Sequence, residues 1–160
     1  MKLLIKQRVF AWADTFDIYD ENGTPRYTVK GKVFSFGHQL HVYDAYGNDI
    51  AEIHEKLFTW TPQFEIVING RVYGIVKKKW TFFKPVYDID FNGWHVEGDF
   101  WDLNYTVFSG NMPIMHITKQ WLSWGDTYVI DINNPQDELM GMLLVVAIDA
   151  AICSQRNNNN

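Results

Sequence analysis

The sequence predicts a mainly β protein: a closed antiparallel barrel of about twelve strands that encloses one hydrophobic C-terminal α-helix. Three observations support this prediction. A short pattern of alternating apolar residues recurs along the chain, and pairs of Asn and Gly separate its copies. The most apolar run of the sequence, LMGMLLVVAIDAAIC at residues 139–153, follows them.

The recurring pattern is apolar, any, apolar, three turn-like residues, apolar, any, apolar. Its first three copies start 24 residues apart, at Phe10, Phe34 and Phe58, and a late copy starts at Leu122. Alternation on both sides of a short turn is typical of a β-hairpin with one buried face. The positions that we expect to face the core are Phe10, Trp12, Phe16, Ile18, Phe34, Phe36, Leu40, Val42, Phe58, Trp60, Phe64, Ile66, Leu122, Trp124, Tyr128 and Ile130.

A second kind of turn lies between the copies, and Asn and Gly mark it because they tolerate the positive φ of tight hairpin turns. These turns are Asn22-Gly23, Gly47-Asn48, Asn69-Gly70, Asn92-Gly93 and Gly110-Asn111. The strands expected between the turns cover residues 3–12, 15–20, 26–36, 39–44, 50–60, 63–68, 71–82, 86–91, 94–100, 103–108, 113–124 and 127–132. Their short connections predict an antiparallel meander, and closure into a barrel would remove its exposed edges.

Residues 135–153 are expected to form the helix. Asn134 can cap it, Pro135 suits its first position, and Glu138 suits its positive end. Residues 140–148 are apolar or Gly all the way round, which is typical of a helix buried in protein or lipid. The apolar run before Asp149 is shorter than the roughly 20 residues that a membrane span needs. The alternatives are packing outside the barrel or in a dimer, and contact with a membrane.

A barrel of about twelve strands has a lumen too wide for its own side chains, since about eight strands is the limit for that. A helix about 10 Å across would fill this lumen. We therefore expect one domain over residues 1–153 with the helix at its centre, followed by a polar, disordered tail at residues 154–160.

The overall composition excludes several classes of function. The formal net charge of −5 gives no general attraction to nucleic acid, and a single cysteine, Cys153, excludes an intrachain disulfide. No transmembrane segment is expected, and we expect a soluble, cytoplasmic protein. The chain contains none of the common nucleophile, phosphate-loop, dinucleotide or zinc-protease motifs.

Several segments in order resemble the LURP-one-related proteins of the tubby C-terminal-like superfamily, and most of all their small bacterial members. They are IKQRVFAWADTFDIYDENGTP, VKKKWTFFKPVYDID, VEGDFWDLNYTV, ITKQWLSWGDTYVIDI and LLVVAIDAAI, and together the resemblance covers residues 2–153. It implies a twelve-stranded antiparallel barrel around a central hydrophobic helix. In the wider superfamily, tubby domains bind phosphoinositides through a basic surface, whereas the small bacterial members bring no activity or site residues to this chain.

A basic residue stands two positions before the first three copies, at Arg8, Lys32 and Lys56. Lys78 stands at the same place before a looser copy, WTFFKPVYDI, that starts at Trp80, and Lys79 adds to this group. Because the strands run up and down with a constant period, we expect these residues near one rim of the barrel, in line with the inward-facing positions. Lys32, Lys56, Lys78 and Lys79 form the candidate site for anionic phospholipid. The alternative is that they cover the end of the helix and pair with acids.

Asp149 is the one carboxylate inside the apolar run. A buried carboxylate must be paired, protonated or near water, so we expect a structural role for Asp149 with a partner among the basic residues. A functional acid is the alternative. His95, Glu97 and Asp99 share one strand face, which we interpret as solvated, and we expect no metal site and no cofactor.

The function expected from these residues is a non-catalytic binding or scaffolding module. Its ligand would be anionic phospholipid or a membrane-proximal protein, bound at the inner membrane surface. Two other classes stay open: an enzyme whose site is assembled from distant residues, and a structural or oligomerisation protein.

Overall fold

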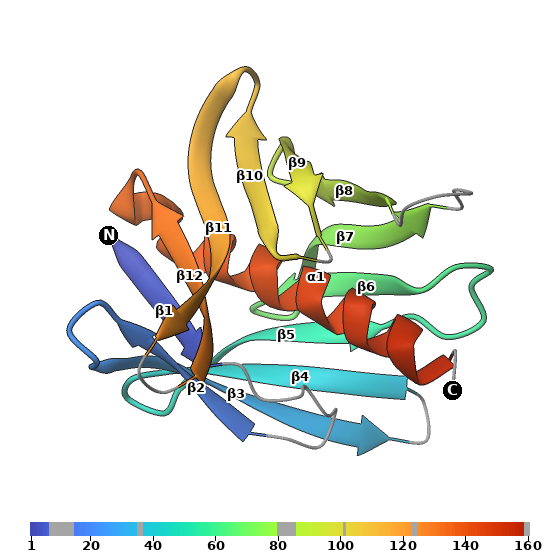
Figure 1. The fold of residues 1–160 in the computed structure, drawn as a ribbon. Coiled ribbons are helices and arrows are strands. Elements are labelled where there is room, and N and C mark those ends of the chain that lie inside the picture. The colour runs from blue at the N-terminus through green and yellow to red at the C-terminus, as the bar shows by residue number, and fades with distance from the viewer. Residues whose placement is uncertain (7–14, 35–36, 80–85, 101, 123–124, 159–160) are drawn as a thin grey trace.

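The computed structural model describes residues 1–6, 15–34, 37–79, 86–100, 102–122 and 125–158. These residues form strands and one long helix (Figure 1). The strands are β1 (Lys2–Lys6), β2 (Thr15–Asp20), β3 (Pro25–Phe34), β4 (Gly37–Asp44), β5 (Asp49–Glu55), β6 (Gln63–Ile68), β7 (Arg71–Lys79), β8 (Val86–Phe91), β9 (Trp94–Asp99), β10 (Asn104–Ser109), β11 (Met112–Leu122) and β12 (Gly125–Ile132).

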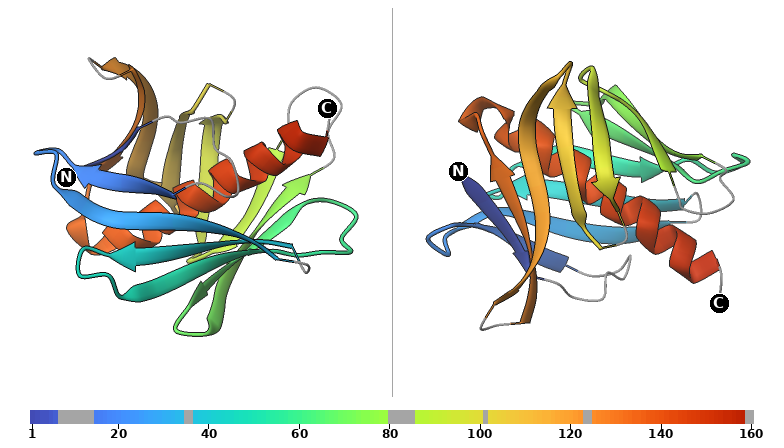
Figure 2. Two further views of the ribbon diagram at one scale, coloured as in Figure 1. Left: turned by 90° about the horizontal axis from the view of Figure 1, so that it is seen from below. Right: turned by 45° about the horizontal axis from the view of Figure 1, so that its top comes forward.

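The strands form one 12-stranded antiparallel sheet in the order β8-β7-β6-β5-β4-β3-β2-β1-β12-β11-β10-β9. The sheet curves around the helix into a nearly closed barrel, which confirms the predicted fold class (Figure 2). Its two edges are β8 and β9, which are consecutive in the chain, and within the described residues no ladder joins them. Aromatic contacts link them instead: Phe91 meets Trp94 edge to face, with ring centroids 5.8 Å apart.

The second half of each apolar pattern faces the interior, as predicted. Ile18, Leu40, Val42, Phe64 and Ile66 are all buried in the core. They alternate with outward residues because successive side chains of a strand point to opposite faces of the sheet. Paired strands flank the predicted turns Asn22-Gly23, Gly47-Asn48, Asn69-Gly70 and Gly110-Asn111, whereas Asn92-Gly93 connects β8 and β9, which no ladder joins among the described residues.

The first half of the pattern behaves differently where the structure describes it. Strand β5 ends at Glu55, not at residue 60, and residues 56–62 form a loop between β5 and β6. Phe58 and Trp60, predicted to be buried, are exposed by 102% and 98%. Phe58 has a φ of 61°, which breaks the period of two and turns its side chain away from the core. The prediction for these two residues is wrong. The corresponding Phe10, Trp12, Phe36 and Trp124 lie outside the described residues.

The helix begins with a 3₁₀ turn, Pro135–Asp137, and continues as α1 (Glu138–Asn158). Asn134 caps it as predicted, since its side-chain oxygen accepts a hydrogen bond from the backbone N–H of Gln136. Residues 141–148 are buried on every side, so the apolar run packs inside the barrel. Among the described residues, no helix combines the length and apolarity that a membrane crossing requires.

Both ends of the helix are fixed to the sheet by carboxylates. Near its start, Arg26 donates two hydrogen bonds to Glu138 at 3.1 and 2.9 Å, and the Tyr27 hydroxyl donates a third. Near its end, the Ser154 hydroxyl donates to Glu55 at 2.9 Å. Ser154 is 4% exposed, and the helix runs to Asn158. The helix therefore continues past Cys153, where the sequence pattern placed its end.

Candidate functional site

The four candidate lysines lie at one end of the barrel, as the alternation of the strands predicts. Strands β3, β5 and β7 run in the same direction. Lys32 lies two residues before the end of β3, Lys56 follows the last residue of β5, and Lys79 is the last residue of β7. One strand separates each neighbouring pair, which corresponds to about 10 Å. We call this group, together with Lys78, the basic end. Arg8 lies outside the described residues.

The predicted orientation of these lysines is wrong for two of them. Lys32 pairs with Gln39 across the β3–β4 ladder, next to the inward pair Gly31 and Leu40, so Lys32 faces outward and is exposed. Lys56 is also exposed, beside Glu65 on the outer face. In β3 and β5 the buried residues are odd-numbered, Val29 and Ile53 among them, so the even-numbered Lys32 and Lys56 point to the outer face. Lys78 shares the inward register of Val76 and is half-buried.

Carboxylates partly neutralise the basic end. The ammonium of Lys56 lies 2.9 Å from Glu65, and that of Lys79 lies 3.4 Å from Asp88. All four side chains are partly or largely exposed, and such pairs contribute about 0–1 kcal/mol each. The pairs can therefore exchange for another anion at little cost.

The loop at residues 56–62 projects from the same end and is fixed by hydrogen bonds. The Thr59 hydroxyl donates to the carbonyl of Thr61 at 2.7 Å, and the backbone N–H of Lys78 donates to the carbonyl of Pro62 at 3.1 Å. The loop holds Phe58 and Trp60 in solvent, with Lys56 at its base. We call Phe58 and Trp60 the aromatic tip. Sequence reasoning missed it because the apolar pattern assigned both residues to the core.

Asp149 lies in α1 and is half-buried. Burial raises the pKa of the Tyr105 hydroxyl well above its usual value, and the charge of Asp149 adds to this shift. The charge of Asp149 therefore reaches the barrel interior, where β10 contributes the fully buried Tyr105.

Replacing Asp149 by asparagine is expected to lower the melting temperature, since the substitution would leave the basic partner expected for Asp149 without its carboxylate. Circular dichroism at neutral pH measures the change. Asp131→Asn is the control, because Asp131 forms an exposed pair with Lys2 at 3.6 Å and should change the melting temperature little. An Asp149→Asn variant that melts at the wild-type temperature would contradict the structural role.

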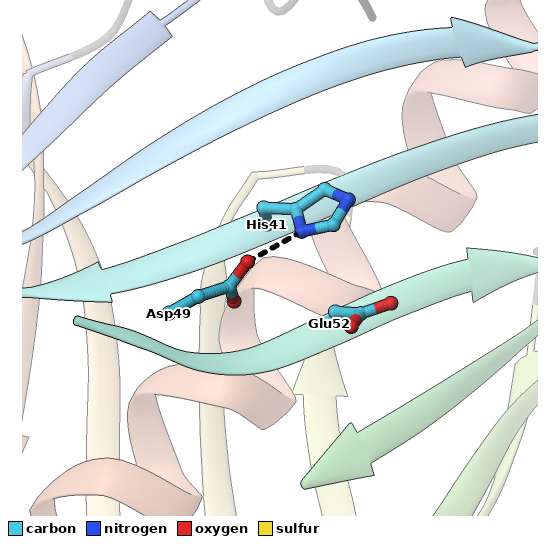
Figure 3. A group of neighbouring side chains, drawn as sticks. All are labelled: His41, Asp49 and Glu52. Atoms are coloured by element: carbon cyan, nitrogen blue, oxygen red, sulfur yellow. Dashed lines mark hydrogen bonds and ion pairs between the residues drawn. The ribbon is translucent and has the colours of Figure 1, made fainter. Parts of the chain in front are cut away.

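A second group of polar side chains lies on the outer face of β4 and β5 (Figure 3). His41, Asp49 and Glu52 each offer one nitrogen or oxygen atom, and these atoms all lie within 4.8 Å of one another. The Nδ1 atom of His41 lies 2.8 Å from Oδ2 of Asp49, and Nε2 of His54 lies 2.5 Å from Oε2 of Glu52. We call His41, Asp49 and Glu52 the histidine–carboxylate cluster.

The carboxylates of the cluster contribute to a raised pKa of the neighbouring Tyr43 hydroxyl. Partial burial, the charge and hydrogen bond of Asp49, and the charge of Glu52 together raise the pKa of the Tyr43 hydroxyl. The cluster was not predicted from the sequence, although one signal was present: a turn at Gly47-Asn48 brings residues 41 and 52 opposite each other. The group His95, Glu97 and Asp99 is looser, with His95 Nε2 3.5 Å from Glu97 on an exposed face.

Comparison with known proteins gives three results. The family model described as LURP-one-related matches residues 1–149. The uncharacterised Bacillus subtilis protein YxjI is 32% identical over 159 residues, which cover 99% of this chain and 98% of that protein. An Arabidopsis thaliana protein with a known X-ray structure superposes with a TM-score of 0.63 over 93% of this chain and 90% of its own, at 16% identity. That last likeness shows the fold alone.

Proposed function

Since this chain belongs to the LURP-one-related family over nearly its whole length, we propose that it is a non-catalytic binding or scaffolding module that docks on an anionic phospholipid surface. The aromatic tip is the observation that carries the proposal, because two large aromatic side chains stand fully in solvent on a hydrogen-bonded loop. In this proposal the protein is cytoplasmic and binds peripherally at the inner membrane surface.

Aromatic side chains suit the boundary between lipid and water. Trp and Phe are typical of surfaces that enter the headgroup region, and burying one such side chain contributes about 1.5–3 kcal/mol. Phe58 and Trp60 can enter a bilayer without unfolding the barrel, since neither side chain packs on the core. Holding Phe58 at a φ of 61° costs energy, which is consistent with a functional position.

The lysines supply the electrostatic part of the interaction. A lysine near an anionic membrane contributes about 1 kcal/mol. Lys32 and Lys56 face outward on the same side of the sheet, and the exposed ion pair of Lys56 with Glu65 can open toward phosphate. Glu65 and Asp88 offset part of this charge, so binding is expected to need both the aromatic tip and the basic end.

The test is co-sedimentation with vesicles of phosphatidylcholine mixed with phosphatidylglycerol, compared with phosphatidylcholine alone. Wild-type protein is expected to sediment with the anionic vesicles at low salt and to be released at high salt. The double variant Phe58→Ser/Trp60→Ser is expected to lose at least about tenfold in binding, because it removes two insertion side chains.

The matched control is Tyr46→Ser/Met112→Ser. These two side chains are also exposed, by 91% and 68%, but they lie at the opposite end of the barrel. The control is expected to bind like the wild type. Absence of wild-type binding at low salt, or an equal loss in the control, would refute the lipid proposal.

A further inference from the structure

The histidine–carboxylate cluster is assembled by the register of the β4–β5 hairpin. His41 and Glu52 are direct cross-strand partners, and both point to the outer face because their neighbours Val42, Ala51 and Ile53 are buried. Cross-strand partners have Cβ atoms about 5 Å apart, which is close enough for their side chains to share one ion.

A β-bulge adds the third member. By simple alternation Asp49 would point inward like Ala51, but the ladder pairs Val42 with Ala51 and then Tyr43 with Asp49, so Ile50 is the extra residue. Ile50 packs against the core, and Asp49 is turned to the outer face beside His41. Bulges commonly re-aim a side chain in this way next to functional sites.

The repeated fold provides an internal comparison. The same bulge occurs in the hairpins β2–β3, β6–β7 and β10–β11. The residues at the position of Asp49 in these three hairpins are Pro25, Val72 and Pro113. The cross-strand pairs at the position of His41 and Glu52 are Asp17 with Thr28, Glu65 with Ile75, and Thr106 with His116. The fold therefore does not require an imidazole and two carboxylates at these positions, and of these four bulged hairpins only β4–β5 has them together.

The chemistry of the cluster matches a divalent transition-metal ion. Imidazole nitrogen and carboxylate oxygen are ligands of zinc and related ions, at bond lengths of about 2.0–2.2 Å. Three ligands gathered within 4.8 Å need only small side-chain rotations to surround such an ion. His54 lies against Glu52 and would orient that carboxylate from behind, as outer-shell partners of metal ligands do.

We propose that His41, Asp49 and Glu52 form a binding site for a divalent transition-metal ion of the zinc type, with water in the remaining coordination positions. The site lies toward the opposite end of the hairpin from the aromatic tip and does not depend on lipid binding. With three protein ligands and an open position, it could also take an anionic ligand through the metal.

The test is isothermal titration of the metal-depleted full chain with zinc chloride at neutral pH. One zinc ion per chain is expected. Variants His41→Ala and Asp49→Asn are expected to bind at least about tenfold more weakly, since even outer-shell changes cost about 10–100-fold in metal affinity. Circular dichroism checks that each variant folds, and Asp49→Asn keeps the size of an exposed side chain.

The matched control is His116→Ala, which removes the histidine at the equivalent place in the β10–β11 hairpin, where its Nδ1 lies 2.8 Å from the Thr106 hydroxyl. The control should bind zinc like the wild type. The proposal is overturned by an absence of zinc binding up to millimolar concentration, by unchanged binding in Asp49→Asn, or by an equal loss in His116→Ala.

Discussion

Replacing Leu144 by alanine is expected to lower the free energy of unfolding by about 2–5 kcal/mol. Leu144 is completely buried in the first half of α1, where the barrel surrounds the helix. The substitution removes apolar contacts and leaves a cavity that a closed sheet cannot easily collapse around. Urea unfolding followed by far-ultraviolet circular dichroism measures the loss.

The control for this prediction is Leu57→Ala. Leu57 is a leucine of the β5–β6 loop and is 39% exposed, so its truncation should cost roughly 1 kcal/mol or less. If both variants lost equal stability, the helix would not be the part of the core that holds the barrel together.

Replacing Gly74 by alanine is expected to cost about 1–3 kcal/mol or more. Gly74 is buried in β7, and an added Cβ atom would lie 2.4 Å from the carbonyl oxygen of Asp90 and 2.8 Å from Cβ of Phe91. The strain would fall on β8, an edge strand that pairs with β7 alone among the described strands. Thermal unfolding and the near-ultraviolet signal of the aromatic residues would both report the loss.

Gly47→Asn is the matched control for Gly74→Ala. Gly47 has a φ of +84°, a Cβ atom added there would meet no other atom within 4 Å, and asparagine tolerates positive φ. This variant should unfold within about 1 kcal/mol of the wild type. A Gly74→Ala variant as stable as Gly47→Asn would mean that β8 shifts freely on β7.

The strand order and the central helix could be predicted because both follow from local physics. Asn69-Gly70 and Asn92-Gly93 show the positive φ values that their residue types favour. The apolar faces of β4 and β5 follow the period of two. The helix lacks a polar face over residues 141–148, and a wide barrel is an environment that can bury it on all sides.

The aromatic tip and the histidine–carboxylate cluster were harder to predict because both depend on breaks in the period. The chain leaves the strand after Glu55 and forms a loop. Phe58 and Trp60 are therefore exposed, although both occupy positions of the pattern that are expected to face the core. The bulge at Ile50 reverses the face of Asp49. A sequence pattern that assumes strict alternation assigns these residues to the wrong side of the sheet.

The pairing of β1 with β12 joins the two halves of the sheet through strands that are far apart in the chain. On the ribosome, strands β1 to β8 therefore emerge long before β12 and α1. Until then their core residues, such as Ile18, Val42 and Phe64, lack the helix whose side chains share that core. Nascent chains in such a state are the ones that chaperones bind and that aggregate most readily. Helix α1 is translated after all the strands, so the core of the barrel is complete only when the end of the chain has been synthesised.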